Sequence, residues 1–257
     1  TASSYTSSFV GDGSGLINIP STAVGAAGAT TEIQYNNNGA LGASSNFIYN
    51  STDNRFSVGT SHISTGLSST IAGGVSNTAS GNCSFIGGGL RNQSTEDYSF
   101  VGGGAFNTAS ERGSFVGGGV LNQSSKGCSF VGGGCTNEAS GFSSVVVGGI
   151  LNTATGNDSF IGGGLKNTAS SACSFVGGGN FNESTNTGSV VVGGLLNTAS
   201  SYSFVGSGER NQATLNSVVG GGLLNIASGF SFVGSGVLNK ALNGYSSIVG
   251  GFQNITS

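Results

Sequence analysis

Residues 99–110 have the sequence Ser-Phe-Val-Gly-Gly-Gly-Ala-Phe-Asn-Thr-Ala-Ser, and variants of this stretch recur along most of the chain. A glycine stands three residues before each repeat asparagine, Ile or Val six before, and Ser eight before. A fixed period with type-specific columns indicates one structural unit stacked on itself. The asparagine returns every fifteen residues, or every fourteen in three C-terminal steps, at Asn77, Asn92, Asn107, Asn122, Asn137, Asn152, Asn167, Asn182, Asn197, Asn211, Asn225, Asn239 and Asn254.

Each copy of the repeat predicts two short strands and two corners. Ser-Phe-Val and Asn-Thr-Ala suit strands, the glycines between them indicate a corner, and no helical period is present. A unit of this length with two strands and two corners makes one turn of a β-solenoid. The extra residue of the longer copies falls after Ala-Ser, in a second and more variable corner. We therefore expect an all-β chain, with a parallel β-roll of about 13 rungs over residues 67–257.

Residues 1–66 lack the repeat and predict an irregular, β-rich N-terminal collar or connector. Residues 32–35 and 46–49 alternate in the manner of strands, and Asn-Gly at 38–39 between them is a turn signal. Residues 51–54 predict a second turn, which leads into a strand at 55–58.

The residues of the first predicted strand should point to opposite sides of the sheet in turn. An Ile or Val in every copy, from Ile71 to Ile248, is expected to line the interior, facing a small residue two positions after each asparagine. The residue before the aliphatic one must then point outward. That position carries Val at three copies and Phe at eight: Phe85, Phe100, Phe115, Phe130, Phe160, Phe175, Phe204 and Phe232.

A line of outward phenylalanines forms an apolar stripe larger than soluble monomers usually expose. Identical stripes on identical chains are best covered by symmetric self-association. We therefore predict a parallel homotrimer with these eight Phe residues at its interface.

The repeat asparagines from Asn77 to Asn197, and their C-terminal counterparts, are expected to be structural corner residues. Asparagine tolerates the left-handed conformation, bonds to nearby backbone and can stack into side-chain ladders. The glycine triplets resemble phosphate loops only superficially, because no helix or Lys follows them in the required place.

The composition excludes several classes of protein. Only 7% of the 257 residues are charged and the net charge is −3, which gives no reason to expect nucleic acid. No apolar run is long enough to span a bilayer. Cys83, Cys128 and Cys173 share one column three copies apart, about 14 Å at strand spacing and beyond disulfide reach. Only Cys128 and Cys135, which belong to one copy, could meet within a chain. We expect free thiols, with a disulfide between chains as the alternative. The start at Thr1 favours a fragment or processed product.

The repeat Ser-Phe-Val-Gly-Gly-Gly-x-x-Asn-x-Ala-Ser-Gly-x-x-Ser resembles the YadA-like head repeat of trimeric autotransporter adhesins, over about residues 68–257. The resemblance implies a left-handed parallel β-roll, trimeric, in an extracellular adhesive or fibre protein. The chain departs from that family in its glycine triplet, its Phe column and its repeat asparagine. Residues 11–20 and 33–42 are similar to segments of phage tail fibres and of fibre-like proteins of large viruses, which favours a viral fibre.

Catalytic and metal-binding chemistry finds little support in the sequence. Glu96 and Glu111 occupy one corner column of successive copies, about 5 Å apart, which is a spacing that glycosidases use. With Arg112 and Lys126 beside them, a solvated corner is the better interpretation. His62, the single histidine, lacks partners for a triad or a zinc site. We expect no enzyme activity, no cofactor and no metal.

Together these features predict a structural fibre or spike protein of a virus or phage. It would be assembled in the host cytoplasm, displayed on the virion surface, and joined to other virion or fibre proteins at its termini. The alternatives are a bacterial trimeric adhesin head on the cell surface and, less favoured, a glycan-cleaving spike. A host glycan or protein receptor would meet exposed residues, for which the candidates are Tyr98, Arg112, Lys126, Lys166, Tyr202 and Arg210.

Overall fold

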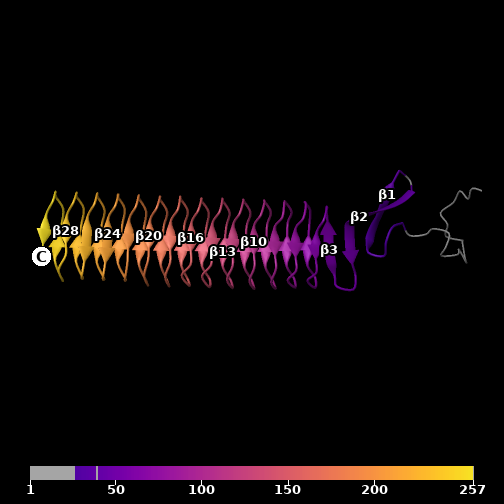
Figure 1. The fold of residues 1–257 in the computed structure, drawn as a ribbon, viewed down its shortest axis with the longest axis horizontal. Coiled ribbons are helices and arrows are strands. Elements are labelled where there is room, and N and C mark those ends of the chain that lie inside the picture. Colours follow the sequence, from indigo (N-terminus) through magenta and orange to yellow (C-terminus); the bar gives the residue numbers. More distant parts are fainter. Residues whose placement is uncertain (1–26, 39, 257) are drawn as a thin grey trace, which may run out of the picture.

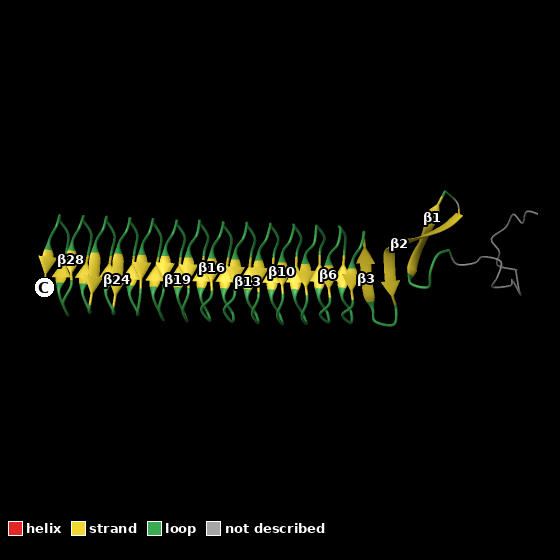
Figure 2. Cartoon of the chain, in the orientation of Figure 1, coloured by secondary structure: helices red, strands yellow, loops and turns green. Residues whose placement is uncertain are grey.

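The computed structural model describes residues 27–38 and 40–256, which form strands, turns and loops without a helix. The chain winds into a straight rod of stacked rungs, with a hairpin at the N-terminal end and the C-terminus at the other (Figure 1). Two sheets run along the rod, and the loops that join them lie along its two edges (Figure 2). No helix long and apolar enough to cross a membrane occurs in the described ranges. The predicted parallel β-solenoid is confirmed.

The first sheet has 16 strands and contains the Phe-Val segment of each rung. Its members are β1 (Glu32–Asn37), β2 (Ala40–Asn50), β3 (Arg55–Val58), β5 (Thr70–Ile71), β7 (Phe85–Ile86), β9 (Phe100–Val101), β11 (Phe115–Val116), β13 (Phe130–Val131), β15 (Val145–Val146), β17 (Phe160–Ile161), β19 (Phe175–Val176), β21 (Val190–Val191), β23 (Phe204–Val205), β25 (Val218–Val219), β27 (Phe232–Val233) and β29 (Ser247–Ile248).

The second sheet has 14 strands and contains the Thr-Ala segments. Its members are β4 (Ile63–Ser64), β6 (Thr78–Ala79), β8 (Gln93–Ser94), β10 (Thr108–Ala109), β12 (Gln123–Ser124), β14 (Glu138–Ala139), β16 (Thr153–Ala154), β18 (Thr168–Ala169), β20 (Glu183–Ser184), β22 (Thr198–Ala199), β24 (Gln212–Thr214), β26 (Ile226–Ser228), β28 (Lys240–Ala241) and β30 (Ile255–Thr256).

The parallel stacking begins earlier than the asparagine repeat. β3 pairs in parallel with β5, and β4 with β6, so an incomplete rung precedes the thirteen that carry asparagine. β2 then pairs antiparallel with β3, and β1 antiparallel with β2. The two turns expected near residues 38 and 51–54 connect these strands, and the hairpin extends the first sheet beyond its first rung. The N-terminal part of the predicted collar, residues 1–26, lies outside the described residues.

The core consists of two facing columns. The aliphatic column, from Ile71 to Ile248, is buried at every rung, as the alternation of the first strand predicts. Opposite it, the small Ala and Ser side chains of the second sheet are fully buried from Ala79 to Ala241. Large side chains on one sheet and small ones on the other allow the two sheets to pack closely in a thin core.

A buried asparagine ladder runs beside this core. The Asn137 backbone N–H donates to the Asn122 side-chain oxygen at 2.9 Å, and the Asn137 oxygen accepts from the Asn152 N–H at 3.0 Å. The Asn137 side-chain nitrogen donates to the carbonyl oxygens of Gly133 and Gly149, at 2.9 and 2.8 Å. Every polar group of the side chain is therefore bonded, which is what burial of an amide requires. The same contacts link every rung from Asn77 to Asn254.

The glycine corner, which runs from the glycine triplet to the asparagine, turns on two residues in the left-handed conformation. One is the third glycine: Gly134 has φ +95°, and a Cβ there would stand 2.1 Å from the Gly149 carbonyl oxygen of the next rung. The other is the residue before the asparagine, such as Leu121 (φ 57°) or Thr136 (φ 55°). The asparagine itself does not take this conformation, and its side chain points inward, where it bonds to the neighbouring rungs.

His62 occupies the ladder position of the incomplete first rung, fifteen residues before Asn77. Its ring Nδ1 accepts the Asn77 backbone N–H at 3.1 Å, which is the contact that an asparagine oxygen makes in every later rung. Its Nε2 lies 2.8 Å from the Val58 carbonyl oxygen. Because a backbone N–H can only donate, Nδ1 is the acceptor and Nε2 carries the proton. His62 therefore begins the ladder.

Candidate binding surfaces

The phenylalanine stripe comprises the eight outward Phe residues and the three Val residues that replace Phe at 145, 190 and 218. It lies on the outer face of the first sheet. Neighbouring rings stack along the rod with centroids 4.8–5.2 Å apart and planes within 10° of each other. The rings are half-buried at most rungs, and Phe204 and Phe232 are 38% and 41% exposed. The stripe thus lies on the outer face as predicted, and its rings remain partly accessible to solvent.

At two rungs of the outer face, a smaller stripe residue is accompanied by a larger residue two positions on. Each Phe ring lies over the glycine two residues on; a Cβ on Gly132 would stand 3.3 Å from the Phe130 ring. Where the stripe has Val145 or Val190, the glycine becomes Val147 or Val192. Phe with Gly, and Val with Val, contribute nearly the same number of side-chain carbon atoms. The surface therefore stays level across the rungs of Val145 and Val190, whereas the rung of Val218, which has Gly220 two residues on, is lower.

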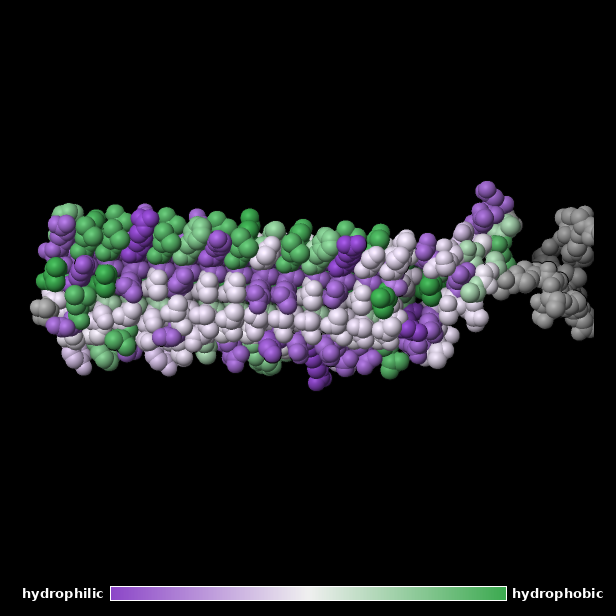
Figure 3. Space-filling model, in the orientation of Figure 1, coloured by the Kyte–Doolittle hydropathy of each residue, from purple (hydrophilic) through white to green (hydrophobic). Residues whose placement is uncertain are grey.

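A second apolar surface, the corner stripe, lies along the glycine corner and was not found from the sequence. It consists of the two residues before each asparagine, and Leu196 at 40% exposure is typical of its exposed apolar members. Hydrophobic side chains gather there as a band along one edge of the rod, interrupted by a few hydrophilic ones (Figure 3). Its exposed apolar members are Val75, Leu90, Phe106, Val120, Leu121, Ile150, Leu151, Phe181, Leu196, Leu224 and Phe252.

Two predicted receptor-facing residues belong to this corner stripe. The Lys166 ammonium lies 5.7 Å from the centre of the Phe181 ring, and Arg91 lies similarly over Phe106 at 5.8 Å. Arg210 pairs with Glu209 at 2.7 Å. Lys166 and Arg210 are thus separated from the other four candidates by the width of the rod. A count of apolar residues at the two positions before each asparagine would have revealed the corner stripe from the sequence.

The opposite edge, the variable corner, holds Tyr98, Arg112, Lys126 and Tyr202. The Arg112 guanidinium lies 5.6 Å from the centre of the Tyr98 ring, so two successive rungs form one aromatic and cationic patch. Tyr202 is farther along the rod and is 66% exposed. An exposed aromatic ring beside hydrogen-bond donors is suited to contact with a polar ligand.

The acidic residues of the variable corner are open to solvent. Glu96 and Glu111 are both exposed, and Asp97 accepts the Asn82 backbone N–H at 2.9 Å. Within residues 27–38 and 40–256, no three His, Cys, Asp or Glu side chains gather in a way that could hold a metal ion. The four cysteines are free; Cys83, Cys128 and Cys173 are exposed on this corner, and Cys135 is half-buried on the corner stripe.

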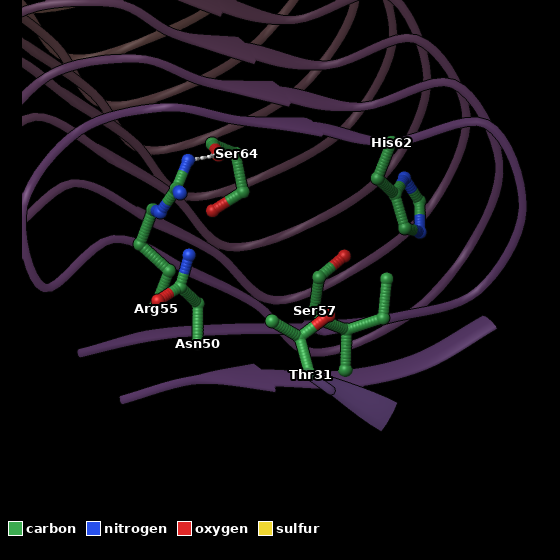
Figure 4. Close-up of a pocket in the computed structure, with 7 residues that line it drawn as sticks. Thr31, Asn50, Arg55, Ser57, His62 and Ser64 are labelled. Atoms are coloured by element: carbon green, nitrogen blue, oxygen red, sulfur yellow. Dashed lines mark hydrogen bonds between the residues drawn. The ribbon is translucent and has the colours of Figure 1, made fainter. Parts of the chain in front are cut away.

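A pocket of about 230 Å³ opens at the N-terminal end of the core. Arg55 and His62 line it from two sides, with Ser57, Ser64, Thr31 and Asn50 between them (Figure 4). The Arg55 guanidinium donates to the Ser64 carbonyl oxygen and pairs with Asp53 at 2.7 Å. The charge of Arg55 is therefore already compensated. Arg55 and His62 both make contacts that close the N-terminal end of the solenoid.

Comparison with known sequences finds no protein-family model that matches this chain and no curated protein that is similar to it. The exposed surfaces of the rod are therefore the features that bear on its function.

Proposed function

We propose that this chain is a segment of a viral or phage fibre: a parallel homotrimeric rod, displayed on the virion surface, whose variable corners face the host. The sequence resemblances to fibre segments and to trimeric head repeats support this proposal. So does the architecture, because a stiff stack of identical rungs spans distance and repeats its surface along its length. We assign it no catalytic activity and no cofactor.

The observation that carries the proposal is the extent of exposed apolar surface. Thirteen rungs at strand spacing make a rod about 60 Å long, and a stripe one side chain wide covers about 600 Å². The corner stripe reaches this size, and the phenylalanine stripe, which spans eleven rungs from Phe85 to Phe232, covers about 500 Å². Soluble monomers rarely expose patches larger than a few hundred Å². Self-association in a closed ring of parallel copies covers both stripes.

The mass of the protein in solution tests the assembly. Light scattering coupled to size-exclusion chromatography should give three times the 25.0 kDa of one chain. The mass should stay the same over a hundredfold dilution, because an interface of this size is stable. A monomeric mass at micromolar concentration would contradict the proposal.

Host attachment is tested separately, with a glycan array and the trimeric protein. Binding should fall at least tenfold in a Tyr98→Ala, Arg112→Ala double variant, because both members of the exposed patch are removed. A Thr153→Ala variant on the outer face of the second sheet is the matched control. Binding that survives the double variant and is lost only with changes elsewhere would move the receptor site away from the variable corner.

The repeat resemblance also supports a second candidate, the head of a bacterial trimeric surface adhesin. The two candidates differ in what surrounds the rod in the complete gene. A coiled-coil stalk followed by a membrane anchor would favour the adhesin, and neighbouring virion structural genes would favour the fibre.

A further inference from the structure

We propose that neighbouring copies pack edge on face: the corner stripe of one copy lies against the phenylalanine stripe of the next, rung by rung. This inference rests on the proposed homotrimer. It adds which two surfaces meet, in which direction, and in which register.

The first argument is that the rod has two apolar stripes and not one. They lie on different sides of the rung, one on the face of the first sheet and one along the edge formed by the glycine corner. A contact between unlike surfaces leaves one stripe of each copy free for the next copy, and it ends only when a ring closes. A twofold contact between like stripes would cover one stripe and leave the other exposed.

The second argument is the spacing. Both stripes offer side chains once per rung, at the strand spacing of about 4.8 Å, over the eleven rungs from Phe85 to Phe232. A partner that fills them must present side chains at the same interval over the same length. A second copy in parallel orientation satisfies this at every rung, because rotation about an axis parallel to the rod keeps each rung at its own height.

The third argument is the shape of the receiving face. At the rungs of Val145 and Val190, a Val–Val pair replaces the Phe–Gly pair of the Phe rungs, and the outer surface keeps nearly the same height there. A face in contact with water has no need of constant height, whereas a face packed against a straight edge does, because a gap between them forfeits van der Waals contact.

The fourth argument is the placement of charge. The phenylalanine stripe carries no charged residue, and the cations of the corner stripe, Arg91, Lys166 and Arg210, all belong to rungs whose stripe residue is Phe. The acidic residue of the corner stripe, Glu209, is paired with Arg210. In register, each of these cations comes near a ring of the neighbouring copy, where a cation over an aromatic face is stabilised. The rungs of Val145, Val190 and Val218 instead carry leucine next to the asparagine.

The buried area is near that of a stable interface. Each contact buries the corner stripe of one copy, about 600 Å², and the phenylalanine stripe of the next, about 500 Å². The total of about 1,100 Å² is close to the lower end of the range of about 1,200–2,000 Å² for specific interfaces. In a closed ring every copy takes part in two such contacts.

Cysteine cross-linking tests the register, because Cys135 already lies on the corner stripe. The experiment uses the full chain with Cys83, Cys128 and Cys173 replaced by Ser, and adds Phe130→Cys in the rung of Cys135. Mild oxidation with diamide should join the copies into covalent dimers and trimers on a non-reducing gel. Phe115→Cys and Val145→Cys, one rung to either side, extend the test if the side-chain geometry at 130 is unsuitable.

The controls lie three rungs away. Phe85→Cys and Phe175→Cys place the new thiol about 14 Å along the rod, beyond disulfide reach, and should give no link to Cys135. Adding Cys135→Ser to Phe130→Cys should abolish the cross-link. A link that persists without Cys135 would mean that the phenylalanine stripes face one another, which overturns the proposal.

Light scattering on each variant, kept reduced, shows whether the trimer forms. A failure of the edge-on-face contact can thus be told apart from a failure of the proposed homotrimer. A trimer in which none of positions 115, 130 and 145 links to Cys135 keeps the fibre assembly and overturns the edge-on-face contact. A link only at the distant positions indicates an antiparallel or shifted arrangement and also overturns it. If the chain with only the three Cys→Ser changes, and with Phe130 intact, is a monomer, the homotrimer itself is contradicted.

Discussion

Asn122 and Asn137 are joined by a hydrogen bond from the backbone N–H of the second to the side-chain oxygen of the first, 2.9 Å long. Because the Asn122 side-chain nitrogen also donates to carbonyl oxygens of its own rung and the next, each ladder asparagine connects two rungs. The rod is thus held together by a buried polar column as well as by its aliphatic column. Both columns are short-range links between neighbouring rungs, as in other repeat proteins.

Replacing a ladder asparagine should be among the most damaging single changes. Asn122→Ala leaves the Asn137 N–H and the Gly118 carbonyl without partners, and it removes one of the two hydrogen bonds to the Gly134 carbonyl. We expect the free energy of unfolding to fall by about 3 kcal/mol. Urea denaturation followed by circular dichroism measures this loss. Hydrogen exchange should locate it at the rungs of Asn122 and Asn137.

The control for this change is the next residue in the chain. Gln123 is exposed on the second sheet, so Gln123→Ala should alter the free energy of unfolding by less than about 0.5 kcal/mol. Equal effects of the two substitutions would show that the ladder contributes no more than an ordinary surface position.

Two adjacent glycines should respond differently to the same substitution. Gly134→Ala places a methyl group 2.1 Å from the Gly149 carbonyl oxygen on a residue with φ +95°, so we expect a loss of several kcal/mol or a failure to fold. Gly133→Ala meets nothing closer than 3.8 Å, at the Gly118 oxygen, and should be tolerated. Expression and thermal melting of the pair provide the measurement; a Gly134→Ala variant as stable as Gly133→Ala would contradict the corner geometry.

His62 should be replaceable by the residue whose place it takes. His62→Asn restores a side-chain oxygen for the Asn77 N–H, and we expect nearly unchanged protection of that amide in hydrogen exchange. His62→Ala removes the acceptor and should weaken the first rung by about 1 kcal/mol, seen as faster exchange at Asn77 with the distant rungs unchanged. Loss of protection in the Asn variant would mean that the ring, and not its acceptor, secures the end of the ladder.

Charge on either apolar stripe should break the assembly. Phe130→Asp and Leu121→Asp each place a carboxylate where another chain is proposed to pack, and burial of an unpaired charge is costly. Light scattering should then show monomers or a strong dependence of mass on concentration. Gln123→Asp, which adds the same charge to the outer face of the second sheet, should leave the trimer intact. A trimer that tolerates both stripe variants would exclude these surfaces from the interface.

The period of the repeat and the alternation within it were enough to predict most of the fold. Val101 and Phe100 are neighbours in a strand, so one had to point inward and the other outward, and the same choice holds at every rung because the unit is repeated. The fifteen-residue step likewise placed each asparagine beside the next. Local periodicity carries this information directly, since stacked rungs turn sequence columns into columns in space.

Only the tertiary structure decided what happens at the corners. The left-handed residue is Leu121 and not Asn122, and that choice turns the leucine outward and creates the corner stripe. His62 begins the ladder although it shares no side-chain type with the residues that continue it. In both cases hydrogen bonds to the neighbouring rungs fix the conformation, and these contacts are not visible in the local sequence. The repeat therefore determined the rungs, whereas contacts between rungs determined which side chains are left for a partner.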